Sequence, residues 1–214
     1  MRNFIILTAT VLLFSCNQSD SKKDEVTKTD QQTDSTKKTV DTLVSKKNDS
    51  ASLVKLSTEI LMAAKARDYE KLARYIHPEK GVRFSPFSYI DTTNNKKVSG
   101  EQLIKLAKEK KKIDWGSGYA EPERLTADQY FAQCVYNEDY LTAGHISVNK
   151  INRGGTAEAI NVNEVYPGRD IVEFFFPGKD KAAEGMDWTA VRLVFEMKDN
   201  TPYLVGIVFD HWTP

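Results

Sequence analysis

Two short segments of the chain hold residue types that could carry acid–base chemistry: Asp210-His211 near the C-terminal end, and His77 directly before Pro78. A carboxylate and an imidazole are groups that general acid–base catalysis commonly uses. Neighbouring side chains of a strand point to opposite faces, however, so Asp210 and His211 could pair directly only if the strand had already ended. His77 is typical of a helix end, because the residue before a proline is pushed out of the helical conformation. These three residues are the catalytic candidates.

The three histidines of the chain are His77, His145 and His211. They have no local spacing typical of a metal site, such as two histidines one helical turn apart. The sequence also contains no phosphate-binding loop and no nucleophile elbow. We therefore predict neither a metal ion nor a cofactor.

Aromatic residues form a second group of candidate site residues. An apolar pocket with a few polar groups is the usual make-up of a small-molecule site. Trp188 and Trp212 each lie near an aspartate at the end of a predicted strand, where a pocket mouth would be, so the ligand-binding candidates are Asp187, Trp188, His211 and Trp212. Core packing explains most other aromatic residues equally well, and these include Trp115, Tyr119, Tyr130, Tyr136, Tyr140, Phe174 and Phe176.

The first residues of the chain predict where the protein is located in the cell. Arg2 precedes an apolar run from Phe4 to Phe14, and polar sequence begins after Cys16. About 11 residues are too few to cross a bilayer, so residues 1–15 are interpreted as a cleaved signal peptide. Ser15-Cys16 resembles the lipobox of bacterial lipoproteins, which implies that Cys16 is acylated. We expect a membrane partner through Cys16 and a location in the bacterial cell envelope, on the outer membrane or cell surface rather than the inner membrane.

The composition excludes one class of partner. The chain has 214 residues with 30 basic and 30 acidic side chains, so no global field attracts nucleic acid. The lysines between Lys105 and Lys112 are interpreted as the solvated face of a helix. Cys134 is the only cysteine besides Cys16, which predicts no intramolecular disulfide.

The domain organisation follows from a change in composition. Residues 16–50 are almost entirely polar and cannot bury enough apolar surface to fold, so we predict a disordered linker after the lipidated cysteine. Residues 51–214 have the size of one globular domain. Helices come first in this domain. Apolar residues recur at helical spacing from Leu53 to Ile76, and capping boxes begin at Ser99 and Thr126.

The end of the domain is dense in β-branched and aromatic residues. Three antiparallel strands are predicted over residues 171–176, 188–197 and 203–209. In the middle strand, apolar residues share one face while Arg192 and Glu196 lie on the other. This alternation predicts a sheet that is buried on one side and partly wet on the other.

Three blocks resemble NTF2-like (SnoaL-like) α+β domains. They are DYEKLARYIHP with GVRFSP at residues 68–86, GMDW at residues 185–188, and LVGIVFDHWTP at residues 204–214. The resemblance is also close to uncharacterised secreted or lipid-anchored bacterial proteins. It implies N-terminal helices packed on a curved antiparallel sheet that forms a cone. It implies no function, because this scaffold carries enzymes, receptors and inert modules.

Three functions stay open at this point. The favoured hypothesis is a non-enzymatic module that binds a small molecule or a protein. The second is a pocket enzyme, a hydrolase or isomerase, that uses Asp210, His211 and His77. The third is a structural or assembly module that uses the open face of the sheet.

Overall fold

The computed structural model describes residues 49–116, 123–142, 145–152 and 160–213. The chain divides into Met1–Ser45 and Lys46–Pro214, and the description below concerns the second unit. Cys16, the predicted signal peptide and residues 16–48 of the predicted linker lie outside the described residues.

Helices dominate the first half of this unit and strands the second. The helices are α1 (Ser50–Ala66), α2 (Tyr69–Ala73), α3 (Gly100–Lys108), α4 (Ala127–Tyr130), the π-helix η1 (Phe131–Val135), the 3₁₀-helices η2 (Tyr140–Thr142) and η3 (Lys181–Ala183), and α5 (Val162–Val165). The strands are β1 (Val82–Ser85), β2 (Lys97–Val98), β3 (Ile113–Asp114), β4 (Arg124–Leu125), β5 (His145–Val148), β6 (Asp170–Phe176), β7 (Thr189–Lys198) and β8 (Thr201–His211). The predicted α+β class is confirmed, and β6, β7 and β8 are the three predicted C-terminal strands.

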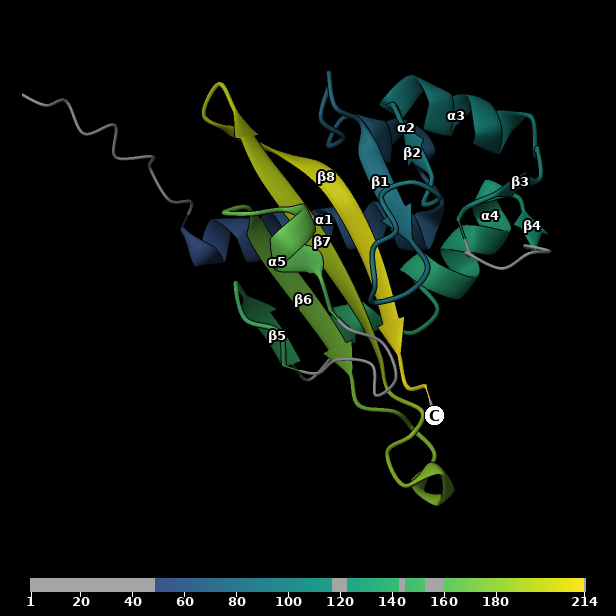
Figure 1. Ribbon diagram of the computed structural model, residues 1–214, viewed down its shortest axis with the longest axis vertical. Coiled ribbons are helices and arrows are strands. Elements are labelled where there is room, and N and C mark those ends of the chain that lie inside the picture. Colours follow the sequence, from purple (N-terminus) through teal and green to yellow (C-terminus); the bar gives the residue numbers. More distant parts are fainter. Residues whose placement is uncertain (1–48, 117–122, 143–144, 153–159, 214) are drawn as a thin grey trace, which may run out of the picture. The chain divides into compact units, whose positions relative to one another are not determined.

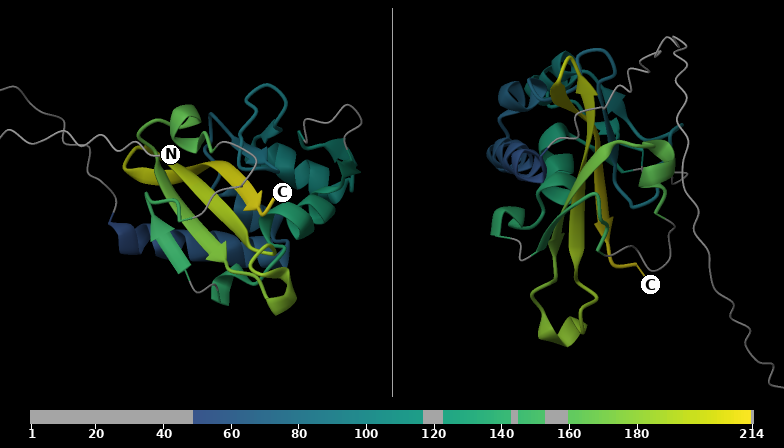
Figure 2. Two further views of the ribbon diagram at one scale, coloured as in Figure 1. Left: turned by 60° about the horizontal axis from the view of Figure 1, so that its bottom comes forward. Right: turned by 90° about the vertical axis from the view of Figure 1, so that its left-hand side faces the viewer.

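The main sheet has the strand order β2-β1-β8-β7-β6-β5 (Figure 1). All neighbours are antiparallel except β1 and β8, which run parallel with Arg83 opposite Gly206. The sheet is curved, with α1 behind it in Figure 1 and α5 in front. Figure 2 shows the same two helices on opposite sides of the sheet. Strands β3 and β4 form a separate small ladder beside α4.

The face of the sheet that α1 covers, here called the first face, carries the main core. Leu53, Ile60 and Leu61 of α1 belong to the same buried cluster as Val191 and Leu193 of β7. These α1 positions follow the helical repeat, so one stripe of the helix is buried. The two predicted capping boxes are confirmed: Ser99 begins α3 with Gln102, and Thr126 begins α4 with Gln129.

The opposite face, here called the second face, corrects a prediction. The alternation along β7 indicated a partly wet face, yet Arg192 is fully buried. Apolar residues from two distant segments cover this face, because Ile90 and Val162 pack on Val194 and on their neighbours in β6 and β8. The side chain of Asn161 exchanges two hydrogen bonds with the backbone of Ile90, at 2.8 and 3.1 Å. This face is still exposed near Glu196 and at His145 of β5, which packs against Phe175, so the prediction fails at Arg192 but not along the whole face.

This coverage also bears on the hypothesis of an assembly module. That hypothesis needs an open apolar face of the sheet, and Ile90 and Val162 cover the apolar residues Ile171, Val194, Val205 and Val208 of the second face. Among the described residues, moreover, no helix has both the length and the apolar character needed to span a membrane.

Candidate functional site

The first face contains a pocket of about 300 Å³ beside the C-terminal end of β8. Its walls come from the segment after β1, the β3–β4 ladder, the α4–η1 helix and β8. Most of the lining is apolar or aromatic, as in sites for small organic molecules. The lining residues are Pro86, Phe87, Trp115, Glu123, Leu125, Tyr130, Gln133, Cys134, Phe209 and His211.

Tyr130 and Trp115 form the aromatic centre of this pocket. Their rings are stacked with centroids 4.5 Å apart, and Phe84 packs edge-on against both. The indole N–H of Trp115 donates to the carbonyl of Leu125 at 2.9 Å. The hydroxyl of Tyr130 is buried and has no hydrogen-bond partner within the described part of the chain. Burial raises the pKa of Tyr130 well above its usual value, so the hydroxyl is a neutral donor.

His211 lies at the pocket between two phenylalanine rings. Its imidazole stacks on Phe209 at 5.2 Å and is tilted against Phe87 at 5.9 Å. The ring is neither fully buried nor fully exposed. His211 is thus the one sequence-predicted site residue that lines this pocket.

Cys134 also lines the pocket but is not activated. Burial, and to a lesser degree the charge of Glu123, raises the pKa of its thiol to about 12. The thiolate is the nucleophilic form of cysteine, so this thiol is chemically quiet at neutral pH.

Asp210 lies on the second face, away from the pocket. Its carboxylate accepts a hydrogen bond from Arg192 Nη2 at 2.6 Å, while Arg192 Nε donates to Glu173 at 2.9 Å. All three side chains are buried. Burial raises the pKa of Asp210 above its ordinary value even though Arg192 acts in the opposite direction. Because β8 continues through His211, the Asp210-His211 pair does not form a catalytic dyad.

Trp188 and Trp212 lie on the same face as Asp210. Trp188 is buried with Phe175, and Trp212 packs against this cluster. The backbone N–H of Trp212 also donates to the carbonyl of Trp188 at 3.2 Å. Neither tryptophan lines the first-face pocket, so a ligand role for them stays a prediction.

Asp187 organises the β6–β7 connection. Its carboxylate accepts the backbone N–H groups of Lys179 and Asp180 at 2.7 and 2.9 Å. These hydrogen bonds, chiefly the one from Asp180, hold the pKa of Asp187 below its ordinary value. Gly178 has φ +91°, and a Cβ there would lie 2.0 Å from this carboxylate, so the close approach requires glycine. A ligand role for Asp187 likewise stays a prediction.

His77 lies near the opposite end of β8 from the pocket. Its Nδ1 accepts hydrogen bonds from the backbone N–H groups of Glu79 and Lys80 at 3.2 and 3.1 Å, and the backbone N–H of His77 donates to the carbonyl of Leu204. Strand β8 rises about 3.3 Å per residue, so the seven steps from Leu204 to His211 span roughly 23 Å. His77 and His211 therefore cannot act on one small substrate.

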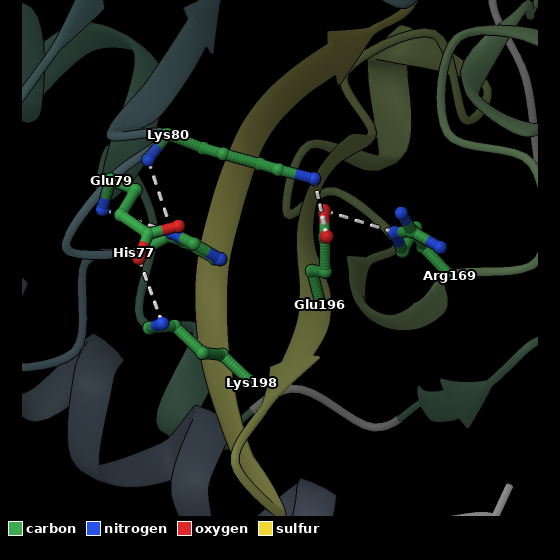
Figure 3. Close-up of polar contacts among 6 residues, drawn as sticks. All are labelled: His77, Glu79, Lys80, Arg169, Glu196 and Lys198. Carbon is green, nitrogen blue, oxygen red and sulfur yellow. Dashed lines mark hydrogen bonds and ion pairs between the residues drawn. The ribbon is translucent and has the colours of Figure 1, made fainter.

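Ion pairs surround the turn at Glu79 and Lys80, whose backbone N–H groups bind His77 (Figure 3). Lys80 and Arg169 both meet the carboxylate of Glu196, and Lys198 pairs with Glu79 at 2.8 Å. The chain segments after α2, before β6 and at the end of β7 are thereby joined. We interpret His77 and these charges as structural, because the backbone N–H groups of the turn occupy Nδ1.

No group of three or more metal-ligating side chains gathers in the described ranges, residues 49–116, 123–142, 145–152 and 160–213. The arrangement at the first-face pocket therefore offers apolar enclosure, stacking and a few hydrogen-bonding groups. These are means of binding, whereas no nucleophile paired with a base is found among the residues that line it.

Of the residues that line this pocket, the sequence pattern singled out His211, and it placed Trp115 and Tyr130 only among aromatic residues that core packing explains equally well. Phe87 and Leu125 carry no local signal, since packing alone brings their segments together. The partial signal for Tyr130 and Cys134 was their four-residue spacing after the capping box at Thr126, which places them on one side of a helix. The buried ion pairs of Arg192 with Glu173 and Asp210 were missed, because charged side chains that alternate with apolar residues in a strand usually face solvent.

Comparison with known proteins adds little to these observations. The sequence matches no family model, and no similar protein is found among the curated proteins. One similar crystal structure is assigned as a calcium/calmodulin dependent protein kinase II association domain from Xanthomonas campestris. The two chains share 13% identity with a TM-score of 0.35, and the match covers 77% of this chain and 88% of the other. A likeness at this level assigns no function to the chain.

Proposed function

We propose that this protein is a lipid-anchored binding protein of the bacterial cell envelope, and that its NTF2-like domain holds a small, largely apolar molecule in the first-face pocket. The observation that carries the proposal is the largely apolar, aromatic lining of this pocket, together with the hydroxyl of Tyr130, a lining residue, which is buried and has no partner among the described residues. Buried polar groups are nearly always hydrogen-bonded, so an unpartnered donor beside a pocket calls for a ligand atom or a water molecule.

The chemistry of the pocket defines the class of ligand. Aromatic lining favours a flat molecule, because flat faces gain the most contact with rings such as those of Phe87 and His211, which are only partly buried. The ligand carries a hydrogen-bond acceptor for the Tyr130 hydroxyl. Its polar edge meets His211 and Gln133, which are more exposed than the aromatic centre.

Binding explains the geometry better than catalysis does. Asp210 and His211 lie on opposite faces of the sheet, and His77 is at the far end of β8. The only thiol that lines the pocket, that of Cys134, is protonated at neutral pH because its pKa is about 12. An enzyme hypothesis would have to rely on His211 and on Glu123, the one carboxylate among the residues that line the pocket, instead of Asp210.

The NTF2-like assignment is supported by the helix pair α1–α2, which leads into β1, and by the curved sheet that α1 crosses (Figure 1). The anchoring part of the proposal is supported by the sequence around Cys16 and by the polar linker that follows it.

A fluorescent apolar probe tests the binding proposal. We would titrate anilinonaphthalene sulfonate into the protein and compare Gln133→Trp, which fills the pocket rim from an exposed position, with Ala132→Trp. Ala132 is the exposed neighbour in η1 that does not line the pocket. Gln133→Trp should abolish most of the fluorescence gain, and Ala132→Trp should leave it unchanged. Equal gains in the two variants would refute binding in this pocket.

Cell fractionation tests the anchor. The wild-type protein should sediment with membranes, and Cys16→Ala should move to the soluble fraction. Sedimentation of the Cys16→Ala protein with membranes would contradict lipidation at Cys16, while leaving the pocket proposal intact.

A further inference from the structure

A second hollow of about 300 Å³ lies between β2, α3 and β3, and it shares no lining residue with the first-face pocket. We call it the lysine groove. Its apolar floor is made by Val98, Leu106 and Ile113. Its remaining lining is polar and consists of Lys96, Lys97, Gln102, Lys105, Glu109 and Lys111.

The charges of the lysine groove are unbalanced. Four lysines face one glutamate, which leaves three positive charges in excess, although the whole chain is neutral. Glu109 compensates Lys105 at 3.9 Å. Lys96, Lys97 and Lys111 make no ion pair with any residue that the structure describes, whereas Lys108 on the same helix as Lys105 pairs with Glu70. The sequence pattern predicted only a solvated helix face for the lysines between Lys105 and Lys112, and Lys96 and Lys97 lie outside that run.

The groove is also held in place by backbone structure. The capping box at Ser99 fixes the start of α3, and the carbonyl oxygen of the Gln102 side chain accepts the Ser99 N–H at 2.9 Å. The amide NH₂ of Gln102 is thereby left as a donor beside the lysines. The backbone N–H of Lys96 donates to the carbonyl of Trp115 at 3.2 Å, which ties β2 to the end of β3.

We propose that the lysine groove binds a multiply charged anion of phosphate chemistry. Lysine ammonium groups bind phosphate as point charges, each with three donors. Several such groups around one hollow favour an anion with two or more negative charges over a carboxylate. The apolar floor accommodates the carbon part of a phosphate ester. Both a soluble phosphate compound and a lipid headgroup carry this chemistry.

The experiment uses the full chain with Cys16→Ala and two probes. Inorganic pyrophosphate is titrated by calorimetry at low ionic strength, and vesicles of phosphatidylglycerol mixed equally with phosphatidylcholine are tested by co-sedimentation. The variant Lys96→Gln/Lys97→Gln/Lys111→Gln removes the three unpaired charges. The control Lys55→Gln/Lys150→Gln/Lys181→Gln changes three exposed lysines elsewhere and has the same net charge.

The groove variant should bind about tenfold more weakly or worse, since three favourable charge contacts are lost, and the control should bind like the parent. If the groove variant loses binding to pyrophosphate, the ligand is a soluble phosphate compound. If it loses binding to the vesicles alone, the ligand is a lipid headgroup. Absence of binding to both probes, or equal weakening in the control, overturns the proposal. Circular dichroism of each variant verifies that the fold is retained. Failure of this test leaves the first-face pocket unaffected.

Discussion

Asp210 and His211 are consecutive residues of β8, yet their side chains belong to opposite faces of the sheet. Asp210 binds Arg192 at 2.6 Å within the second face, while His211 lines the first-face pocket between Phe87 and Phe209. The two-residue period of a strand enforces this separation. A pair that suggests catalysis in the sequence is thus divided between a buried ion cluster on one face and the lining of a pocket on the other.

Arg192→Met should destabilise the domain strongly. The substitution leaves the carboxylates of Glu173 and Asp210 buried without their shared cation, which costs about 3–5 kcal/mol. Urea denaturation monitored by circular dichroism measures this loss. Lys65→Met is the matched control, because Lys65 and Asp139 form an exposed ion pair, which solvent screens and which therefore contributes little to stability. Similar losses in the two variants would contradict a structural role for the buried triplet.

Tyr130→Phe should not destabilise the domain. Removing a buried hydroxyl that has no partner should raise the free energy of unfolding by up to about 1 kcal/mol, or leave it unchanged. Tyr69→Phe should do the opposite, because the Tyr69 hydroxyl donates to Asp128 at 2.6 Å. Chemical denaturation of both variants gives the comparison, and a clear loss of stability in Tyr130→Phe would show that its hydroxyl is already satisfied in the free protein.

Cys134 should react slowly and report on the pocket. With a pKa of about 12, the thiol is ionised in only about one molecule in 10⁴ at pH 8, so alkylation by iodoacetamide should be at least about a hundredfold slower than in the unfolded chain. The unit Lys46–Pro214 contains no other cysteine, and mass spectrometry follows the reaction. Glu123→Gln should speed labelling, because the charge of Glu123 contributes to the raised pKa. Rapid labelling of the folded protein would show that the thiol is activated.

Local patterns predicted the three C-terminal strands and the starts of two helices, but not the short strands β2, β3, β4 and β5. The strands β6, β7 and β8 follow from dense β-branched and aromatic runs, and the capping boxes at Ser99 and Thr126 follow from short motifs whose two side chains lie three residues apart. Such signals are visible in the sequence because the interacting residues are neighbours along the chain.

Long-range contacts were not predictable in the same way. Arg192 alternates with apolar residues exactly as a solvated side chain would, and its burial depends on Ile90 and Val162, which come from segments far away in the sequence. The pocket likewise depends on Phe87 and Leu125, which reach Tyr130 only through tertiary packing. A single sequence therefore indicates which face of β7 is apolar but not whether the other face is covered.

Asp187→Asn should change how stability depends on pH. The backbone N–H groups of Asp180 and Lys179 favour the ionised carboxylate, so the pKa of Asp187 is lower in the folded protein than in the unfolded chain. The stability that this group contributes is present above the unfolded pKa of about 3.9 and is lost as the pH falls through the folded pKa. Asparagine keeps an acceptor oxygen but does not titrate.

Melting temperatures of wild type and Asp187→Asn, measured from neutral pH down to acid, reveal this difference. The variant should melt lower at neutral pH, and the gap should close as the pH falls below about 4, because the wild-type carboxylate then becomes neutral as well. Glu184→Gln, in the same β6–β7 connection, is the control, since no hydrogen bond to its carboxylate is present within the described part of the chain. A gap that stays constant with pH would mean that Asp187 supports this connection through its shape alone and that its charge contributes nothing.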